Sequence, residues 1–134
     1  MSNLNWQYVK PLQDPNAVTQ LATAAGVKLS ADVIAALQEH NGGRPDKKTF
    51  DTTHTKERVL KSFLSFNKDD KGSAFVIVDT LKKEHPGLFP FASDPGGDYV
   101  CITTEGKVVL WLHETNTVEA AANSFSEFLS ALYE

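Results

Sequence analysis

The chain of 134 residues is long enough for one domain with its own core, and 41% hydrophobic and 22% charged residues are ordinary for a globular protein. No apolar run reaches the roughly 20 residues of a transmembrane helix, and the N-terminus lacks the basic start and apolar stretch of a signal peptide. A single cysteine, Cys101, excludes an intramolecular disulfide. We therefore expect a cytoplasmic protein without membrane association.

The net charge of −4 is unevenly distributed along the chain. Residues 86–134 hold seven acidic residues and one base, Lys107, whereas residues 1–85 carry a small positive excess. Phosphate contacts need clustered Lys and Arg, so the acidic part argues against nucleic acid and suits a basic protein partner. The alternative, which is equally well supported, is that these acids only keep the polar face of the last helix in water.

Two helices are predicted in the N-terminal third, and we expect them to form a hairpin. Asp14 and Pro15 resemble an N-cap and a first helical residue, and apolar residues at three- and four-residue spacing follow up to Gly26. A second helix is predicted to begin at Ser30 and to end at Asn-Gly-Gly, residues 41–43. A nest of backbone N–H groups is the less common role for these last three residues.

The middle of the chain is less regular. Residues 44–56 are polar and predict a loop, and residues 58–66 (RVLKSFLSF) predict a strand, although a short apolar run also fits a helix. Residues 67–72 predict a charged turn. Ser73 resembles the N-cap of a third helix that runs to His85, but β-branched residues leave a strand open for its first half.

The C-terminal third is predicted to contain three strands and a helix. The strands are expected at residues 89–92, 99–103 and 107–113, with a tight turn at 104–106 between the last two. The third of these strands is apolar on both sides, as in a central strand that is covered on both faces.

The predicted last helix begins with Asn116 and Glu119, which have the spacing of a capping box. A continuous apolar stripe then runs from Val118 to Leu132. The order of elements predicts a single domain, residues 1–134, of the α+β class: a central antiparallel sheet (meander) flanked by N-terminal helices and a C-terminal amphipathic helix.

The segment Asp94-Pro95-Gly96-Gly97-Asp98 joins two of the predicted strands. Asp94 and Asp98 are candidate ligands of a hard cation, but the alternating acids of a calcium loop are missing. No Lys-Ser/Thr pair follows the glycines, as a phosphate-binding loop requires. The composition instead predicts a turn that is rich in residues tolerant of positive φ.

Other candidates for chemistry are weak. Cys101 lies in a predicted strand, where a lone cysteine is usually a small buried hydrophobe, and nothing around a pair with His113 would lower its thiol pKa. The four histidines are scattered without zinc-site spacing. We therefore predict that the protein is not an enzyme and holds no metal or cofactor. Trp6 and Tyr8 are expected to fix the N-terminal segment to the core, the alternative being a free aromatic patch for a partner.

Several segments together resemble a known family. In chain order they are an opening at Trp6 and Val9, "HNGGRP" (40–45), "LFPFASDPGGDYVCI" (88–102), "VVLWLHE" (108–114) and "SFSEFLSAL" (124–132). This set resembles the SUKH superfamily, specifically the Smi/Knr cell-wall-assembly-regulator-like domains that are abundant in bacteria. Residues 49–83 match only in their general hydrophobic rhythm.

The resemblance implies an α+β domain without catalytic apparatus. Many bacterial members are immunity proteins of toxin–antitoxin type, so we expect a domain that binds and neutralises a co-encoded polymorphic toxin, such as a nuclease with a basic surface. The alternative is a regulatory or scaffold interaction module without a toxin, and a third interpretation is a small enzyme or ligand-binding protein that uses the Asp94–Asp98 loop or Cys101. From the charge imbalance alone, the candidate contact residues are Asp94, Asp98, Glu105 and Glu114.

Overall fold

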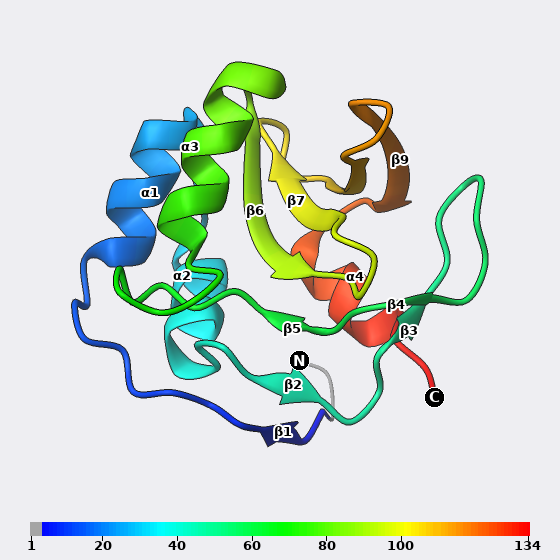
Figure 1. The fold of residues 1–134 in the computed structure, drawn as a ribbon. Helices are drawn as coiled ribbons and strands as arrows, with labels where there is room; N and C mark the ends of the chain where they lie inside the picture. The colour runs from blue at the N-terminus through cyan, green and yellow to red at the C-terminus, as the bar shows by residue number, and fades with distance from the viewer. Residues whose placement is uncertain (1–3) are drawn as a thin grey trace.

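A computed structural model describes residues 4–134, which form four helices, a five-stranded sheet and two small two-stranded sheets (Figure 1). The helices are α1 (Ala17–Ala25), α2 (Ala31–Glu39), α3 (Ala74–Glu84) and α4 (Phe125–Ala131). The large sheet consists of β5 (Ser62–Phe63), β6 (Leu88–Ser93), β7 (Tyr99–Thr103), β8 (Val108–Leu112) and β9 (Thr117–Ala122). The small sheets pair β1 (Trp6–Gln7) with β2 (Arg44–Pro45) and β3 (Thr49–Phe50) with β4 (Arg58–Val59).

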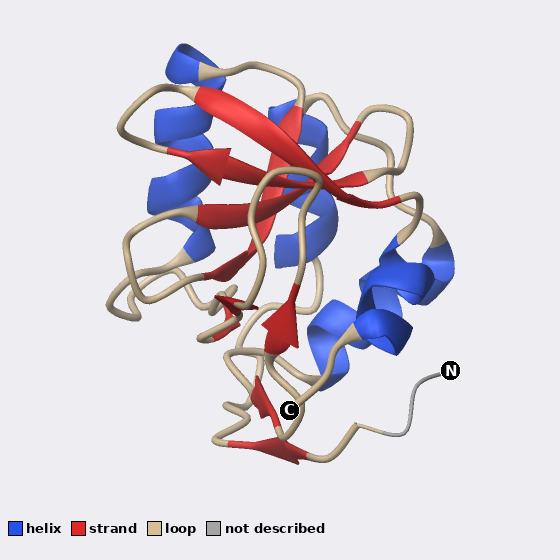
Figure 2. Ribbon diagram, turned by 90° about the vertical axis from the view of Figure 1, so that its right-hand side faces the viewer, coloured by secondary structure: helices blue, strands red, loops and turns tan. Residues whose placement is uncertain are grey.

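The large sheet is antiparallel throughout, and its strands lie in chain order with α3 inserted between β5 and β6. Helices flank its strands on both sides, as Figure 2 shows. The predicted α+β class, the antiparallel meander and the C-terminal helix are thereby confirmed. None of the helices within residues 4–134 is long and apolar enough to cross a membrane.

The two faces of the sheet pack into different clusters. One face belongs to the main core, and its strand residues include Val100, Ile102, Val108 and Leu110, which share that core with Phe125 and Phe128 of α4. The opposite face carries Cys101, Val109 and Trp111, which pack with Leu81 of α3. The central strand β8 is therefore buried on both sides, as its apolar sequence predicts.

Two predicted helix starts are confirmed by their caps. The Ser30 hydroxyl accepts a hydrogen bond from the Val33 N–H at the start of α2. The Ser73 hydroxyl likewise accepts a hydrogen bond from the Phe75 N–H at the start of α3. Because α3 is helical over its whole length, the strand alternative is excluded. A serine cap satisfies a backbone donor that has no partner inside the helix, so the sequence signal and the structure agree.

The first helix begins later than predicted. Asp14 does not cap α1; its Oδ1 accepts from the Asn16 N–H at 2.9 Å and its carbonyl from the Ala17 N–H at 3.1 Å. Asp14 and Pro15 thus form a turn before the helix, and Asn16 occupies the N-cap position without a side-chain bond. Asp followed by Pro is typical of a turn as well as of a helix start, and here it forms the turn.

The middle segment differs from the prediction in two places. Residues 44–56, predicted as a loop, contain β2 and β3, and residues 58–66, predicted as one strand, are divided into β4 and β5. The division falls where the chain changes partner: the Leu60 N–H donates to Lys48, whereas the Lys61 N–H donates to Ser93 of β6. Such a change of sheet depends on distant segments and leaves no local pattern.

The predicted continuous C-terminal helix is wrong. Residues 117–122 form β9, which pairs with β8, and α4 begins only after Ser124, whose hydroxyl accepts from the Glu127 N–H at 3.1 Å. Asn116 has a φ of 53° and belongs to the turn between β8 and β9 rather than to a helix cap. The apolar spacing of this alanine-rich stretch fits a helix, but pairing along β8 outweighs the local preference.

Candidate functional site

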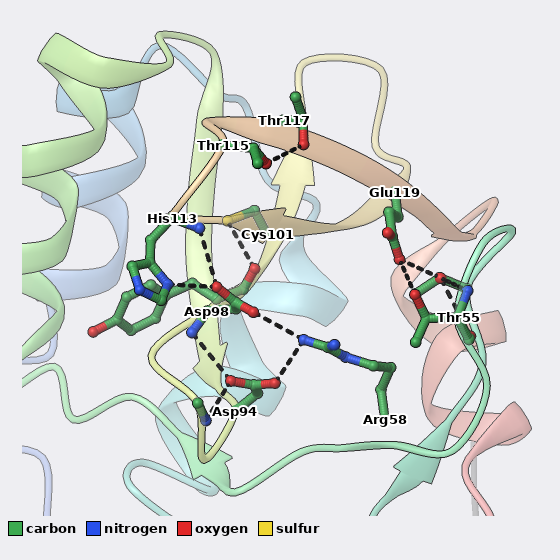
Figure 3. Close-up of polar contacts among 12 residues, drawn as sticks. Thr55, Arg58, Asp94, Asp98, Cys101, His113, Thr115, Thr117 and Glu119 are labelled. Atoms are coloured by element: carbon green, nitrogen blue, oxygen red, sulfur yellow. Dashed lines mark hydrogen bonds and ion pairs between the residues drawn. The ribbon is translucent and has the colours of Figure 1, made fainter.

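The segment from Asp94 to Asp98 is a turn that its own side chains stabilise (Figure 3). Asp94 Oδ1 accepts from the Gly96 N–H at 2.8 Å and from the Asp98 N–H at 3.1 Å, and the Asp94 N–H donates to the Asp98 carbonyl at 3.0 Å. Gly97 has a φ of 93°, which glycine adopts without strain. The prediction of a turn between two strands is confirmed.

Arg58 of β4 joins the two acids of this turn. Its Nη2 lies 2.9 Å from Asp94 Oδ2 and 2.9 Å from Asp98 Oδ2. The Asp94 and Asp98 side chains are only 7% and 13% exposed, so both carboxylates are satisfied inside the protein. Arg58 Nε is buried and has no partner among the described residues. Arg58 was not predicted as a site residue, because nothing local relates it to a loop 36 residues away.

His113, just after β8, completes this cluster. Its backbone N–H donates to Asp98 Oδ1 at 3.0 Å, and its ring Nδ1 lies 2.6 Å from the same oxygen. Burial is the largest single influence on the pKa of Asp98 and raises it, but the hydrogen bonds from His113 and Arg58 together lower the pKa below its ordinary value. Asp98 is therefore held in its charged form between the guanidinium of Arg58 and the hydrogen bonds from His113.

The four predicted contact residues lie at two ends of the sheet. Asp94, Asp98 and Glu114 line one hollow of about 390 Å³, together with Arg58 and His113. Glu105 lies in the turn at the opposite end of β7. Glu105 and Glu114 are exposed, and neither carboxylate forms an ion pair or hydrogen bond with a residue in the described range.

Glu105 stands between two further hollows. One, of about 570 Å³, lies between the start of α2 and the start of α4, and Val33, Ile102 and Phe125 provide apolar lining. The other, of about 560 Å³, lies along β9 and includes Glu127 in its lining. The exposed carboxylate of Glu105 is thus placed beside recessed surface rather than on a convex tip.

Glu119 of β9 holds the long connection between β3 and β4, which extends from the body of the protein (Figure 1). Its Oε1 accepts from the Thr52 hydroxyl at 2.6 Å and from the Thr55 hydroxyl at 2.9 Å. These hydrogen bonds, that from Thr52 first, lower the pKa of Glu119. The Thr53 N–H also donates to the Ala120 carbonyl, so this connection covers part of the outer edge of β9.

The candidate reactive side chains, Cys101 and His113, are separated from each other. Cys101 is fully buried, and burial raises the pKa of its thiol. Its neighbour on β8 is Val109, so His113 is not its partner. His113 is oriented by Asp98, but among the described residues that line their hollow the only hydroxyl belongs to Thr115, which bonds to Thr117. No group of three or more possible metal-ligating side chains occurs within residues 4–134.

The N-terminal aromatic residues have different positions. Trp6 stacks on His40 with ring centroids 4.3 Å apart and also contacts Phe63, as expected for a residue that fixes the segment to the core. Tyr8 is 71% exposed, and its ring contacts Arg44. The prediction is therefore confirmed for Trp6 and wrong for Tyr8.

Asn-Gly-Gly, residues 41–43, does more than end α2. The buried Asn41 side chain accepts from the Phe66 N–H at 2.6 Å, and its amide donates to the Lys10 carbonyl at 3.4 Å. At Gly43 a Cβ atom would lie 2.9 Å from Val9 Cγ2 and 3.2 Å from the Trp6 ring, so the N-terminal segment can approach only a glycine. The segment thus joins the helix end to the N-terminal segment.

The sequence was compared with protein-family models and with curated proteins. A model of the SMI1/KNR4 family (SUKH-1) matches residues 14–131, which extend from the turn before α1 to the end of α4. No curated protein matches the chain.

Proposed function

Because the chain belongs to the SMI1/KNR4 family (SUKH-1), we propose that it is a protein-binding domain of the immunity type, which neutralises a toxin encoded beside it. The family match is the observation that carries this proposal, since it extends over nearly all of the chain and is consistent with an immunity-type domain. In this proposal residues 1–134 form one such domain, which acts in the cytoplasm of the producing cell.

The charge distribution supports a basic partner. Glu105 and Glu114 are exposed carboxylates without internal partners among residues 4–134, and each borders recessed surface. Acidic groups at a rim raise the rate of encounter with a basic protein more than they raise the final affinity. These two residues are accordingly the proposed direct contacts.

Asp94 and Asp98 support the binding surface indirectly and are not proposed as direct contacts. Their carboxylates are engaged by Arg58 and His113, so they hold the shape and charge of the turn next to Glu114. A partner would meet the ordered turn and its exposed glycines rather than two free acids. In this arrangement the protein acts by binding, and Cys101 and His113 have structural roles.

The decisive experiment is co-expression of the chain with the product of the adjacent gene. If the proposal is correct, that product alone stops growth, co-expression restores it, and the two proteins purify as one complex. Arg58→Met, which removes the contacts of Arg58 with Asp94 and Asp98 of the turn, serves as a variant with impaired binding for comparison. An adjacent product that is harmless, or that is toxic and is neither bound nor inhibited, contradicts the immunity function and favours the regulatory scaffold.

A further inference from the structure

Tyr8 is held in an unfavourable backbone conformation without being buried. Its φ is 61°, a left-handed value that bulky residues rarely adopt. Pairing of Gln7 with Arg44 fixes the chain before it, and the Lys10 N–H donates to the Asn41 carbonyl at 2.8 Å after it. Tyr8 as a whole is 71% exposed, so the strain brings no packing against the core. Strain of this kind is concentrated at sites with a function.

The exposed ring is accompanied by a cation and a second apolar side chain. The Arg44 guanidinium lies 5.5 Å from the centre of the Tyr8 ring, and Val9 is 42% exposed. Tyrosine and arginine are enriched among the residues that contribute most to protein–protein binding. Because both backbone neighbours are fixed, this pair is positioned before a partner arrives, which reduces the entropy lost on binding.

A basic hollow adjoins Tyr8 along the chain. This hollow, which we call the lysine hollow, has a volume of about 310 Å³, and its lining includes Lys10, Gly42, Lys61, Ser62, Lys71 and Tyr99. The methylenes of Lys10 lie over Gly42, where a Cβ atom would be 3.5 Å from Lys10 Cδ. Lys10 lies two residues after Tyr8 and lines the hollow, so the chain leads from the Tyr8–Arg44 pair into it.

The positive charge of the lysine hollow is only partly neutralised from within. Asp94 lines it, but Arg58 takes the Asp94 carboxylate. Asp70 lies 3.7 Å from Lys10 Nζ, and its carboxylate also accepts from Ser65 and Asn67. Lys61 and Lys71 are exposed and form no ion pair within the described part of the chain. Two ammonium groups thus remain for an external anion.

We propose that Tyr8, Arg44 and the lysine hollow form a second interaction surface, which binds an acidic segment of a protein partner. Carboxylates fit the ammonium groups and the guanidinium, and the Tyr8 ring supplies a preorganised apolar contact. A polypeptide fits better than nucleic acid, because the acidic C-terminal part of the chain repels an extended polyphosphate while a short acidic segment stays within the basic surface. Glu105 and Glu114 do not line the lysine hollow, although this hollow shares Asp94 with the one that Glu114 borders. The proposal does not depend on the immunity function.

The test is an NMR titration of the ¹⁵N-labelled full chain with capped hexaglutamate, capped hexaglutamine and hexathymidylate as probes. Hexaglutamate is expected to shift the amide signals of Tyr8, Gly42 and Gly72 in a saturable manner that weakens with salt, whereas hexaglutamine leaves them unchanged. Removal of both amines in K61A/K71A is expected to raise the Kd by about tenfold.

Two variants make the outcome specific. K82A/K83A removes the same charge from exposed positions at the far end of α3 and is expected to change the Kd by less than about twofold. Tyr8→Asn removes the ring but tolerates a left-handed φ, and it is expected to weaken binding about fivefold.

Three results overturn the proposal. Absence of localised shifts with hexaglutamate, equal weakening by K82A/K83A, or tighter binding of hexathymidylate would each show that the surface is not a site for acidic polypeptides. The exposed positions keep all variants foldable, and thermal unfolding verifies this for each.

Discussion

The indole Nε1–H of Trp111 donates a hydrogen bond to Asn116 Oδ1 at 2.7 Å, which joins the end of β8 to the residue just before β9. The Asn116 amide also donates to the Glu84 carbonyl at 2.7 Å, at the end of α3. One side chain in a left-handed turn therefore connects two strands and a helix. This connection fixes the position of the turn between β8 and β9, which contains Glu114.

Replacement of Asn116 by alanine is expected to reduce the free energy of unfolding by about 2–4 kcal/mol, since a partly buried indole N–H loses its acceptor and alanine is strained at positive φ. Asn116→Gly, which accepts this φ, is expected to lose about 1 kcal/mol less. Urea unfolding of both variants measures the difference. A wild-type stability for Asn116→Ala would show that the hydrogen bond from Trp111 is unimportant.

Asn116 also shows where sequence reasoning fails. Its three-residue spacing from Glu119 fits a helix cap, but its hydrogen-bond partners are Trp111 and a carbonyl of α3, which the local pattern does not contain. Ser30 and Ser73 were predicted correctly because a cap bond reaches only two or three residues along the chain. Local signals therefore predicted the α2 and α3 starts, and pairing along β8 determined β9.

The same distinction between local signals and long-range pairing applies to the candidate site. The turn from Asp94 to Asp98 was predictable because its hydrogen bonds are internal. Arg58 and Tyr8 were not, since the first is set by the pairing of β4 with β3 and the second by the pairing of β1 with β2. The contacts of Arg58 with Asp94 and Asp98 span 36 and 40 residues, and composition alone does not show that these two acids are paired.

Arg58→Met is expected to reduce the free energy of unfolding by about 2–4 kcal/mol, because it leaves two largely buried carboxylates without their shared partner. Addition of Asp98→Asn to this variant is expected to recover part of the loss, since one unpaired charge disappears. Lys61→Met, an exposed base on the same segment, is the matched control and is expected to stay within about 0.5 kcal/mol of wild type. Equal losses for Arg58→Met and Lys61→Met would contradict the role of the cluster.

Acid stability is expected to depend on Asp98. Its pKa in the folded protein lies below the ordinary 3.8, so the folded state binds this proton less readily than the unfolded chain does. The contribution of Asp98 is therefore complete above about pH 5 and is lost as the pH falls below 3.8 through the folded pKa.

Unfolding measured between pH 2 and pH 6 tests this dependence. Asp98→Asn is expected to be less stable at pH 6 and to lose less stability on acidification than wild type. Asp79→Asn, at an exposed position of α3, is expected to keep the wild-type slope. Parallel curves for wild type and Asp98→Asn would be evidence against a lowered pKa.

Cys101 is expected to resist thiol reagents in the folded protein. Its side chain is fully buried and its thiol pKa is raised, so iodoacetamide labelling is expected to be at least about a hundredfold slower than that of a free cysteine. The same protein in concentrated guanidinium chloride provides the fully reactive reference. Rapid labelling of the folded chain would revive the interpretation that Cys101 takes part in chemistry.

The exposed acids are expected to determine how fast the proposed toxin binds. Glu105→Lys and Glu114→Lys are each expected to lower the association rate about two- to fivefold at low salt and less at high salt, because screening removes long-range attraction. Asp79→Lys, the same reversal on α3, is expected to have a smaller effect if the contact lies near these residues.

The two positions also distinguish the ends of the sheet. A larger effect of Glu114→Lys on complex dissociation would place the partner against the turn held by Arg58, whereas a larger effect of Glu105→Lys would place it beside the hollow between α2 and α4. Stopped-flow association and dissociation at two salt concentrations separate steering from contact. If neither reversal changes either rate while the toxin is still neutralised, the acidic contact is wrong and the immunity function stands.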